Sequence, residues 1–251
     1  MSKDWTKIRA KVKDFIESEI YPKETELAKG TPEAREMLGS LMQLAKDEKI
    51  WALGHPEDIG GGGMPFMEYV YVNEVIGRSS FAMVALGTHS LQDSIMLREF
   101  ASPHWRDQYL EPLVQGEIFP SFGMTEPDVA SSDPTQLQTT AILENGTWKI
   151  NGTKWFTTGA ARAAYTTVMC RTELDAPSHG AFSMIIVPTD NPGYKIVRET
   201  PVLGINGGHY EVKYDNVEVP EENLLGPRGQ GFIIAQKRLG PGRIFHCMRW
   251  L

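Results

Sequence analysis

The sequence predicts an α+β protein: an all-helical part over residues 1–120, then an antiparallel β-sandwich or barrel over residues 121–228. Up to about residue 120 the apolar residues recur every three or four positions, the period of an amphipathic helix. Beyond residue 119, short alternating runs rich in β-branched and aromatic residues are separated by turn signals. At Gly229 the helical period returns, so residues 229–251 are predicted to open a further, truncated helical bundle.

The first helix is predicted from an apolar stripe that begins at Trp5 and ends at Ile20, and Pro22 is expected to stop it. Thr31 followed by Pro32 has the pattern of an N-cap with proline at the first helical position, which predicts a second helix. Further helices are expected over residues 65–77, 80–101 and 102–114. The glycine run at residues 60–63 is interpreted as a flexible connection rather than a phosphate-binding loop, because no predicted strand precedes it.

Seven strands are expected, with a strand-like run at residues 119–122 before them. Asn145-Gly146 and Asn151-Gly152 supply hairpin turn signals between the runs. No helix-length pattern separates the strands, which favours antiparallel pairing over a doubly wound sheet. The strands are predicted at residues 136–143, 147–150, 154–157, 166–171, 182–187, 194–199 and 210–219.

Composition excludes several classes of protein. The 251 residues carry 25 basic and 32 acidic side chains, a net charge of −7, which argues against a nucleic-acid binder. No apolar run is long enough to span a membrane, and the first 15 residues resemble neither a signal peptide nor a transit peptide. Two cysteines make a disulfide framework improbable. We therefore expect a cytoplasmic protein, or one of the mitochondrial matrix or peroxisome in a eukaryote.

Known motifs exclude some chemistries. The six histidines form no H-x-x-H or H-x-x-x-H pair, so no metal site is expected. The sequence also has no G-x-S-x-G nucleophile elbow and no phosphate-binding G-x-x-x-x-G-K-S/T motif. Neither zinc, serine-hydrolase nor nucleoside-triphosphatase chemistry is therefore predicted.

Two segments stand out. Residues 122–133, FGMTEPDVASSD, combine hydroxyls, carboxylates and small residues in a loop, which suits either an anionic or carbonyl-rich ligand or a local turn. Residues 154–160 place Trp155 and Phe156 side by side on a strand. Alternation would send the two rings to opposite faces, one into the core and one toward a cleft, where it could stack on a planar cofactor. Core packing is the favoured alternative for these aromatics.

Together the two segments resemble the flavin-contacting signatures of the acyl-CoA dehydrogenase family. Further stretches agree in order and spacing along the whole chain, which makes the resemblance specific. They are WRDQYLEPLVQGE (105–117), NGTKW (151–155), YDNVEVP (214–220), NLLG (223–226) and GQGF (229–232).

The resemblance implies FAD as the cofactor and assigns site residues one by one. Met124 and Thr125 would contact the pyrimidine side of the isoalloxazine ring, Thr158 would lie near its N5, and Ser131 would lie where FAD and acyl-CoA meet. The implied cofactor-binding residues are Phe122, Met124, Thr125, Ser131, Phe156, Thr157 and Thr158. The implied substrate-binding residues are Ser131, Ser178 and Arg243.

Three departures from the family pattern are present. Asp128 and Ala130 replace glycines of the usual loop, which reduces backbone freedom there. Phe156 stands where Trp is common. The family's catalytic carboxylate lies beyond residue 251 or, in some members, at the position of Gly242, so no catalytic residue is assigned within this chain.

The reaction implied is α,β-dehydrogenation of an acyl-CoA to trans-2-enoyl-CoA with hydride transfer to flavin N5, within fatty acid and lipid metabolism. An electron-transfer flavoprotein is the implied electron acceptor, and the full-length form is expected to be a homo-oligomer. We expect this chain alone to bind FAD poorly and to turn over nothing. The alternatives are a flavin oxidase or monooxygenase, and a non-catalytic flavin- or CoA-binding module.

Overall fold

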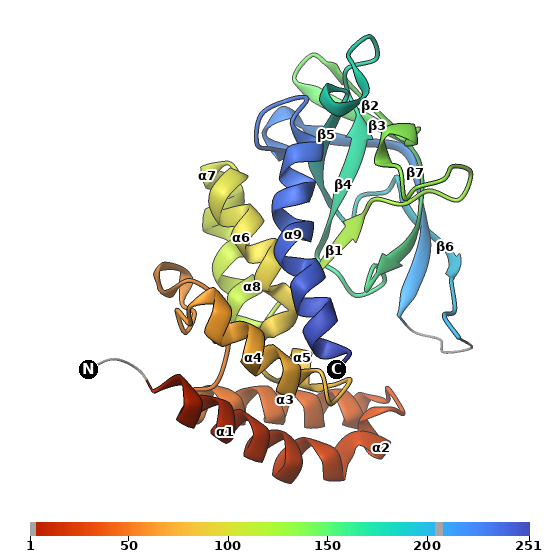
Figure 1. Ribbon diagram of the computed structural model, residues 1–251. Helices are drawn as coiled ribbons and strands as arrows, with labels where there is room; N and C mark the ends of the chain where they lie inside the picture. The colour runs from red at the N-terminus through yellow and green to blue at the C-terminus, as the bar shows by residue number, and fades with distance from the viewer. Residues whose placement is uncertain (1–3, 204–207) are drawn as a thin grey trace. The chain divides into compact units, whose positions relative to one another are not determined.

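The computed structural model describes residues 4–203 and 208–251 (Figure 1). The chain forms two compact units. The first comprises Met1–Ile95, Val114–Gly116 and Arg238–Leu251, and the second comprises Met96–Leu113 and Glu117–Lys237. The sequence-based division at residues 120 and 228 stays a prediction. Within the described ranges no helix is both long and apolar enough to cross a membrane.

The N-terminal helical region runs further than the sequence predicts. Helix α1 (Trp5–Phe15) continues through a π-helical turn (Ile16–Ile20) and a 3-10 turn (Tyr21–Lys23) into α2 (Glu24–Leu27). The prediction that Pro22 ends the helix is wrong. Proline lies in the first turn of the 3-10 segment, where the amide hydrogen that it lacks needs no helical acceptor.

Helix α3 (Pro32–Asp47) begins as predicted, with the Ala34 amide donating to Oγ1 of Thr31 at 3.3 Å. Helix α4 (Phe66–Ile76) contacts α1 and carries mostly buried residues. Both helices agree with the sequence pattern.

The single helix expected over residues 80–101 is interrupted. It is split into α5 (Ala82–Ala85) and α6 (Leu91–Phe100), which are joined through Gly87. Gly87 has a φ of +69°, and a Cβ there would lie 2.5 Å from the indole ring of Trp51. The backbone turns here because only glycine fits against that ring.

The glycine run at residues 60–63 is a closed turn rather than a flexible connection. The amides of Gly61, Gly62 and Gly63 donate to the carbonyls of Pro56, Ala52 and His55 at 2.9–3.0 Å. A Cβ on any of the three would come within 2.7 Å of a neighbouring atom. Close approach of the backbone therefore explains the glycines.

The predicted helix over residues 102–114 consists of α7 (Pro103–Trp105), a π-helical turn (Arg106–Leu110) and α8 (Glu111–Gln115). In the second unit Trp105 stacks on Tyr109, with ring centroids 4.5 Å apart, and both rings meet Tyr165 of the sheet edge-on. Aromatic packing therefore seats this helical segment against the sheet within the same unit.

The described strands of the second unit form one sheet with the order β6-β7-β3-β2-β4-β5-β8, and β1 pairs with β4 (Figure 1). Most pairs are antiparallel, as expected, but β1 and β2 each pair with β4 in parallel, so the sheet is mixed. The strands are β1 (Pro120–Gly123), β2 (Thr140–Glu144), β3 (Thr147–Thr158), β4 (Tyr165–Arg171), β5 (Phe182–Pro188), β6 (Tyr194–Glu199), β7 (His209–Pro220) and β8 (Leu224–Leu225).

Two strand predictions differ from the structure in extent. The runs predicted at residues 147–150 and 154–157 form one strand, β3, because a register shift at Gly152 lets it continue along β7. The strand predicted from residue 136 begins only at Thr140, since Pro134–Gln136 form a 3-10 turn. The apolar core of the sheet is centred on Trp148, Val168 and Tyr214, all fully or almost fully buried.

Helix α9 (Gly231–Arg249) follows the sheet. Its C-terminal half belongs to the first unit, where Phe245 packs edge-on against Tyr69 at 5.1 Å and its carbonyl accepts from Asn73 Nδ2 at 2.7 Å. Phe245 is thus buried within the first unit, whereas Ile244 and Trp250 are exposed.

Candidate functional site

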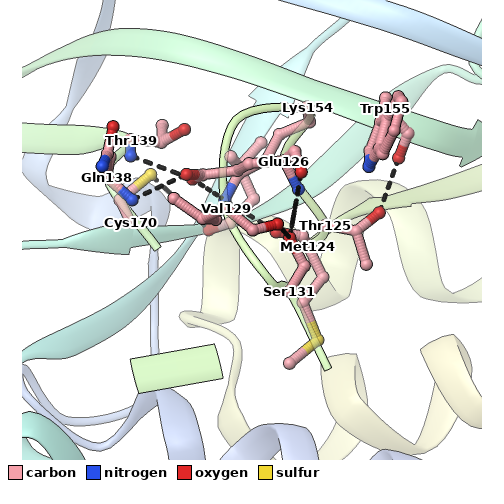
Figure 2. Close-up of polar contacts among 11 residues, drawn as sticks. Met124, Thr125, Glu126, Val129, Ser131, Gln138, Thr139, Lys154, Trp155 and Cys170 are labelled. Atoms are coloured by element: carbon pink, nitrogen blue, oxygen red, sulfur yellow. Dashed lines mark hydrogen bonds and ion pairs between the residues drawn. The ribbon is translucent and has the colours of Figure 1, made fainter. Parts of the chain in front are cut away.

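A buried ion pair holds the segment that follows β1. The Nζ of Lys154, on β3, lies 2.8 Å from Oε1 of Glu126 and 2.9 Å from the carbonyl of Met124 (Figure 2). The amides of Gln138 and Thr139 donate to the two carboxylate oxygens of Glu126 at 2.7 and 2.9 Å. Both charges are therefore satisfied inside the protein, which burial requires.

The pKa values of the pair reflect this burial. Burial raises the pKa of Glu126, but the Lys154 ammonium and the hydrogen bonds outweigh it and hold the pKa below its ordinary value. Burial lowers the pKa of the Lys154 ammonium, and the Glu126 carboxylate opposes that effect. Glu126 is thus anionic at neutral pH and anchors the loop at residues 122–133.

A bulge in β3 presents the neighbouring aromatics. Between Lys154 and Thr157 the pairing with β7 shifts register, and the backbone of Trp155 pairs with Thr125 instead. The Trp155 amide donates to the Thr125 carbonyl at 3.0 Å, and Thr125 Oγ1 donates to the Trp155 carbonyl at 2.8 Å. This exchange ties the loop to the strand at two points.

The expectation that Trp155 and Phe156 face opposite sides of the strand, with core packing favoured, is wrong. Phe156 has a φ of +50°, so the alternation is broken, and its ring lies against that of Trp155 with centroids 4.8 Å apart. Trp155 is half-buried and Phe156 is 42% exposed, whereas Lys154 and Thr157 point into the core. Left-handed backbone at an aromatic residue is costly, which is typical of a site that needs the ring displayed.

Phe156, Trp155, Thr158 and His209 form what we call the aromatic platform. Thr158 Oγ1 lies 2.9 Å from Nδ1 of His209, and the imidazole meets the Phe156 ring at 6.3 Å. Ser121 Oγ donates to the Thr158 carbonyl at 2.8 Å, which fixes the end of β3 to β1. An exposed ring beside two hydrogen-bonding side chains suits a planar, polar ligand.

Sequence reasoning missed His209. The predicted strand began one residue later, and only the register, in which Thr158 and His209 are direct partners, brings the two together. Lys154 and Glu126 were also not singled out, because they are 28 residues apart and a lysine on an alternating strand is expected to face solvent.

Ser131 closes the loop. Its hydroxyl accepts from the Glu126 amide at 2.8 Å and lies 3.1 Å from the Glu126 carbonyl and 3.3 Å from that of Val129 (Figure 2). Asp128 and Ala130, which the resemblance places where glycines are usual, are exposed between these anchors. The turn therefore closes through a side chain rather than through extra glycine freedom.

The remaining predicted residues lie in three settings. Phe122 is half-buried on β1, and the side chain of Thr157 is buried, so only its backbone can face a ligand. Ser178 is exposed on a short 3-10 turn of the second unit. Hydrogen bonds from Thr135 and Gln136 lower the pKa of Asp133, and the charge of His179, which follows Ser178, adds a minor contribution. Arg243 is exposed on α9 in the first unit.

Two family models match most of this chain. The acyl-CoA dehydrogenase N-terminal domain model matches residues 2–117, and the middle-domain model of the same family matches residues 121–217. The chain belongs to the acyl-CoA dehydrogenase family. The helical N-terminal region, the mixed sheet and the following helix match structures of this family.

Similar proteins come from bacteria and animals. The probable acyl-CoA dehydrogenase FadE2 of Mycobacterium tuberculosis is 41% identical over 97% of this chain, which spans 62% of that protein. Acyl-CoA dehydrogenase family member 11 of Homo sapiens is 36% identical over 95% of this chain, which spans 33% of it. A Mycobacterium abscessus structure assigned to the acyl-CoA dehydrogenases has a TM-score of 0.91 at 35% identity, covering 99% of this chain and 66% of that one.

Close packing surrounds Gly242, the position that the resemblance matches to the catalytic carboxylate of some family members. A Cβ at Gly242 would lie 2.2 Å from Nε2 of Gln92, and that amide donates to the Arg238 carbonyl at 3.1 Å. A carboxylate at residue 242 would displace Gln92 from this contact. Glycine at this position therefore leaves room for the Gln92 amide, the end of a flexible side chain.

Proposed function

We propose that this chain carries the flavin- and acyl-CoA-binding part of an FAD-dependent acyl-CoA dehydrogenase. The observation that carries the proposal is the aromatic platform, displayed by a strained bulge next to a loop that a buried ion pair fixes. Family membership supports it, and so does a neighbouring fold, the glutaryl-CoA dehydrogenase of Mycobacterium smegmatis, whose structure is a complex with FADH2.

The donor set fits the isoalloxazine ring of FAD. Phe156 offers an exposed apolar face, and Thr158 and His209 offer hydrogen bonds at its side. Thr125 bonds to Trp155 of the bulge, and the Met124 carbonyl accepts from Lys154 at its start. Ser131 bonds to Glu126 in the same loop, and Phe122 precedes them on β1. When bound, FAD supplies the two-electron oxidation that amino-acid side chains cannot perform.

The chain's own residues hold the flavin-binding loop and the aromatic platform in position. Lys154 and Glu126 hold the loop rigid, and the Thr125–Trp155 exchange fixes the ring-bearing bulge to it. We propose Ser178 and Arg243 as acyl-CoA contacts, with α,β-dehydrogenation to a trans-2-enoyl-CoA as the reaction of the full-length form. Because Gly242 leaves no carboxylate at that position, we expect no turnover from this chain alone.

Family membership also supports proposals for the substrate, the electron acceptor and the oligomeric state. We propose an acyl-CoA as the substrate, an electron-transfer flavoprotein as the electron acceptor and a homo-oligomeric full-length form that acts in fatty acid metabolism. An electron transferring flavoprotein structure from Acidaminococcus fermentans is among the similar folds, at 25% identity and a TM-score of 0.83.

Absorption spectroscopy tests the proposal. FAD titrated into the purified chain should shift its visible bands at high protein concentration, and an acyl-CoA added without oxygen should leave the bands unbleached. In the full-length form the same addition should bleach them for at least one acyl chain length. A chain that leaves the FAD spectrum unchanged overturns flavin binding, and bleaching in the 251-residue chain overturns the Gly242 argument. Peroxide formed under air would favour a flavin oxidase or monooxygenase instead.

A further inference from the structure

His209 has a fixed position beside the hydroxyl of Thr158. The amide of Thr200 donates to the His209 carbonyl at 2.9 Å, and the amide of Gly159 donates to the carbonyl of the preceding Gly208 at 2.9 Å. The backbone of the first residue of β7 is thus held from both sides, and its ring lies over the edge of Phe156. The strand register pairs Thr158 with His209, and Nδ1 lies 2.9 Å from Oγ1 of Thr158.

Whether Nδ1 of His209 carries a proton decides where the Thr158 hydroxyl points. If Nδ1 is protonated, it donates to Oγ1 and leaves the hydroxyl hydrogen free to point outward. If Nδ1 is unprotonated, it accepts that hydrogen, and Thr158 offers a lone pair to a ligand. One ring atom therefore switches the outward-facing group at residue 158 between donor and acceptor.

We propose that His209 is a positioning residue for the flavin, which sets the hydrogen-bonding polarity of Thr158 toward the ring. The proposal rests on the proposed function. Oxidised isoalloxazine offers acceptor atoms, so it would prefer Thr158 as a donor, with a proton on Nδ1 of His209. The two-electron-reduced ring carries an additional N–H, so it would prefer Thr158 as an acceptor, with Nδ1 of His209 unprotonated.

Other titratable groups lie on the flanking elements. The Tyr210 hydroxyl, on β7, donates to Oε1 of Glu199, on β6, at 3.3 Å. Burial, followed by Glu199, raises the pKa of Tyr210, whereas Arg162, in the turn after β3, lowers it. A pH effect of His209 must therefore be separated from these groups by substitution.

The test is the affinity for oxidised FAD between pH 5 and 8.5, measured by quenching of flavin fluorescence on the 251-residue chain. In the wild type the affinity should fall about tenfold from the acidic to the basic end of this range, the size of one hydrogen bond. His209→Asn keeps a hydrogen-bonding atom near the position of Nδ1 but has no ionisable ring, so its affinity should lose this pH dependence. Thr158→Val, which keeps the shape and removes the hydroxyl, should lose it too.

Ring ¹⁵N spectra of the flavin-free chain provide a second readout. They should show that neutral His209 carries its proton on Nε2, and Thr158→Val should change the His209 shifts. The matched control is His104→Asn, at an exposed histidine on α7, which should keep the wild-type pH profile. An identical pH profile in His209→Asn and wild type, or a flat wild-type profile, overturns the role of His209 alone. Absence of any FAD quenching by the wild type overturns the proposed function, and this inference with it.

Discussion

The Lys154 ammonium and the Glu126 carboxylate meet at 2.8 Å with both side chains almost completely buried. Three backbone groups complete the pair: the carbonyl of Met124 and the amides of Gln138 and Thr139. The loop after β1, the residues just before β2 and the second half of β3 therefore share one polar centre.

Lys154→Met should lower the free energy of unfolding by about 3 to 5 kcal/mol, because it leaves the Glu126 charge buried without its cation. Glu126→Gln should be similarly costly. The double variant should lose clearly less than the two single losses combined, since it removes both charges. Urea unfolding measures all three.

An exposed pair on the same strands gives the matched control. Lys149 and Glu218 lie 3.6 Å apart on β3 and β7, with side chains 44% and 61% exposed. Lys149→Met should change the unfolding free energy by less than about 1 kcal/mol. A loss for Lys149→Met equal to that of Lys154→Met would contradict the importance of the buried pair.

His55 should make the first unit sensitive to acid. Burial, and then the charge of His89, lower the pKa of His55 to about 4, and its Nε2 lies 3.1 Å from Ser90 Oγ. Between pH 6.5 and pH 4 the unfolded chain binds a proton on this residue that the folded chain does not. Stability is therefore unaffected above pH 6.5 and falls by on the order of 3 kcal/mol as the pH decreases to 4.

Urea unfolding at a series of pH values measures the effect of His55. His55→Gln should flatten the stability profile between pH 4 and 6.5, whatever it costs at pH 8. His104→Gln, at an exposed histidine, should leave the slope as in the wild type. A wild-type slope retained in His55→Gln would show that another group is responsible.

The two thiols should differ in reactivity. Burial raises the pKa of Cys170 to about 12, whereas Cys247 is exposed on α9. Because the thiolate is the nucleophile, a thiol reagent at pH 8 should label one equivalent quickly and the second only on unfolding. Cys247→Ser should remove the fast phase, and a fast phase that survives in that variant would contradict the burial of Cys170.

The sequence predicted the features that depend only on neighbouring residues. Thr31 and Pro32 gave the start of α3 because capping depends on neighbours in sequence. Pro22 was misjudged because a switch from π-helical to 3-10 geometry made room for it, and no local pattern signals that switch. The sequence pattern thus locates helix starts better than it locates changes of helix type.

The site depends on contacts that are distant in sequence. The direction of Phe156 follows from a bulge that Thr125 stabilises from 30 residues away, so strict alternation gave the wrong face for one aromatic. Family resemblance located the segments at residues 122–133 and 154–160, but the pairing of Thr158 with His209 required the register of β3 and β7.

Phe156→Gly should separate the contribution of the exposed ring to FAD binding from its contribution to stability. Glycine relieves the strain at a φ of +50°, which offsets the lost contacts of a ring already 42% exposed. The free energy of unfolding should therefore change by less than about 1 kcal/mol. The affinity for FAD should fall about tenfold or more, because the exposed face of the platform is removed.

Asn145→Gly is the matched control for that variant, since Asn145 has a φ of +51° in the turn between β2 and β3, outside the platform. It should keep the wild-type affinity for FAD, and its backbone is relieved less because asparagine adopts left-handed backbone more readily than phenylalanine. If Phe156→Gly lost several kcal/mol of stability, Phe156 would be a structural residue and its exposure would need another explanation. If it bound FAD as the wild type does, the platform would not be the flavin-binding surface, because the ring is its largest exposed apolar element.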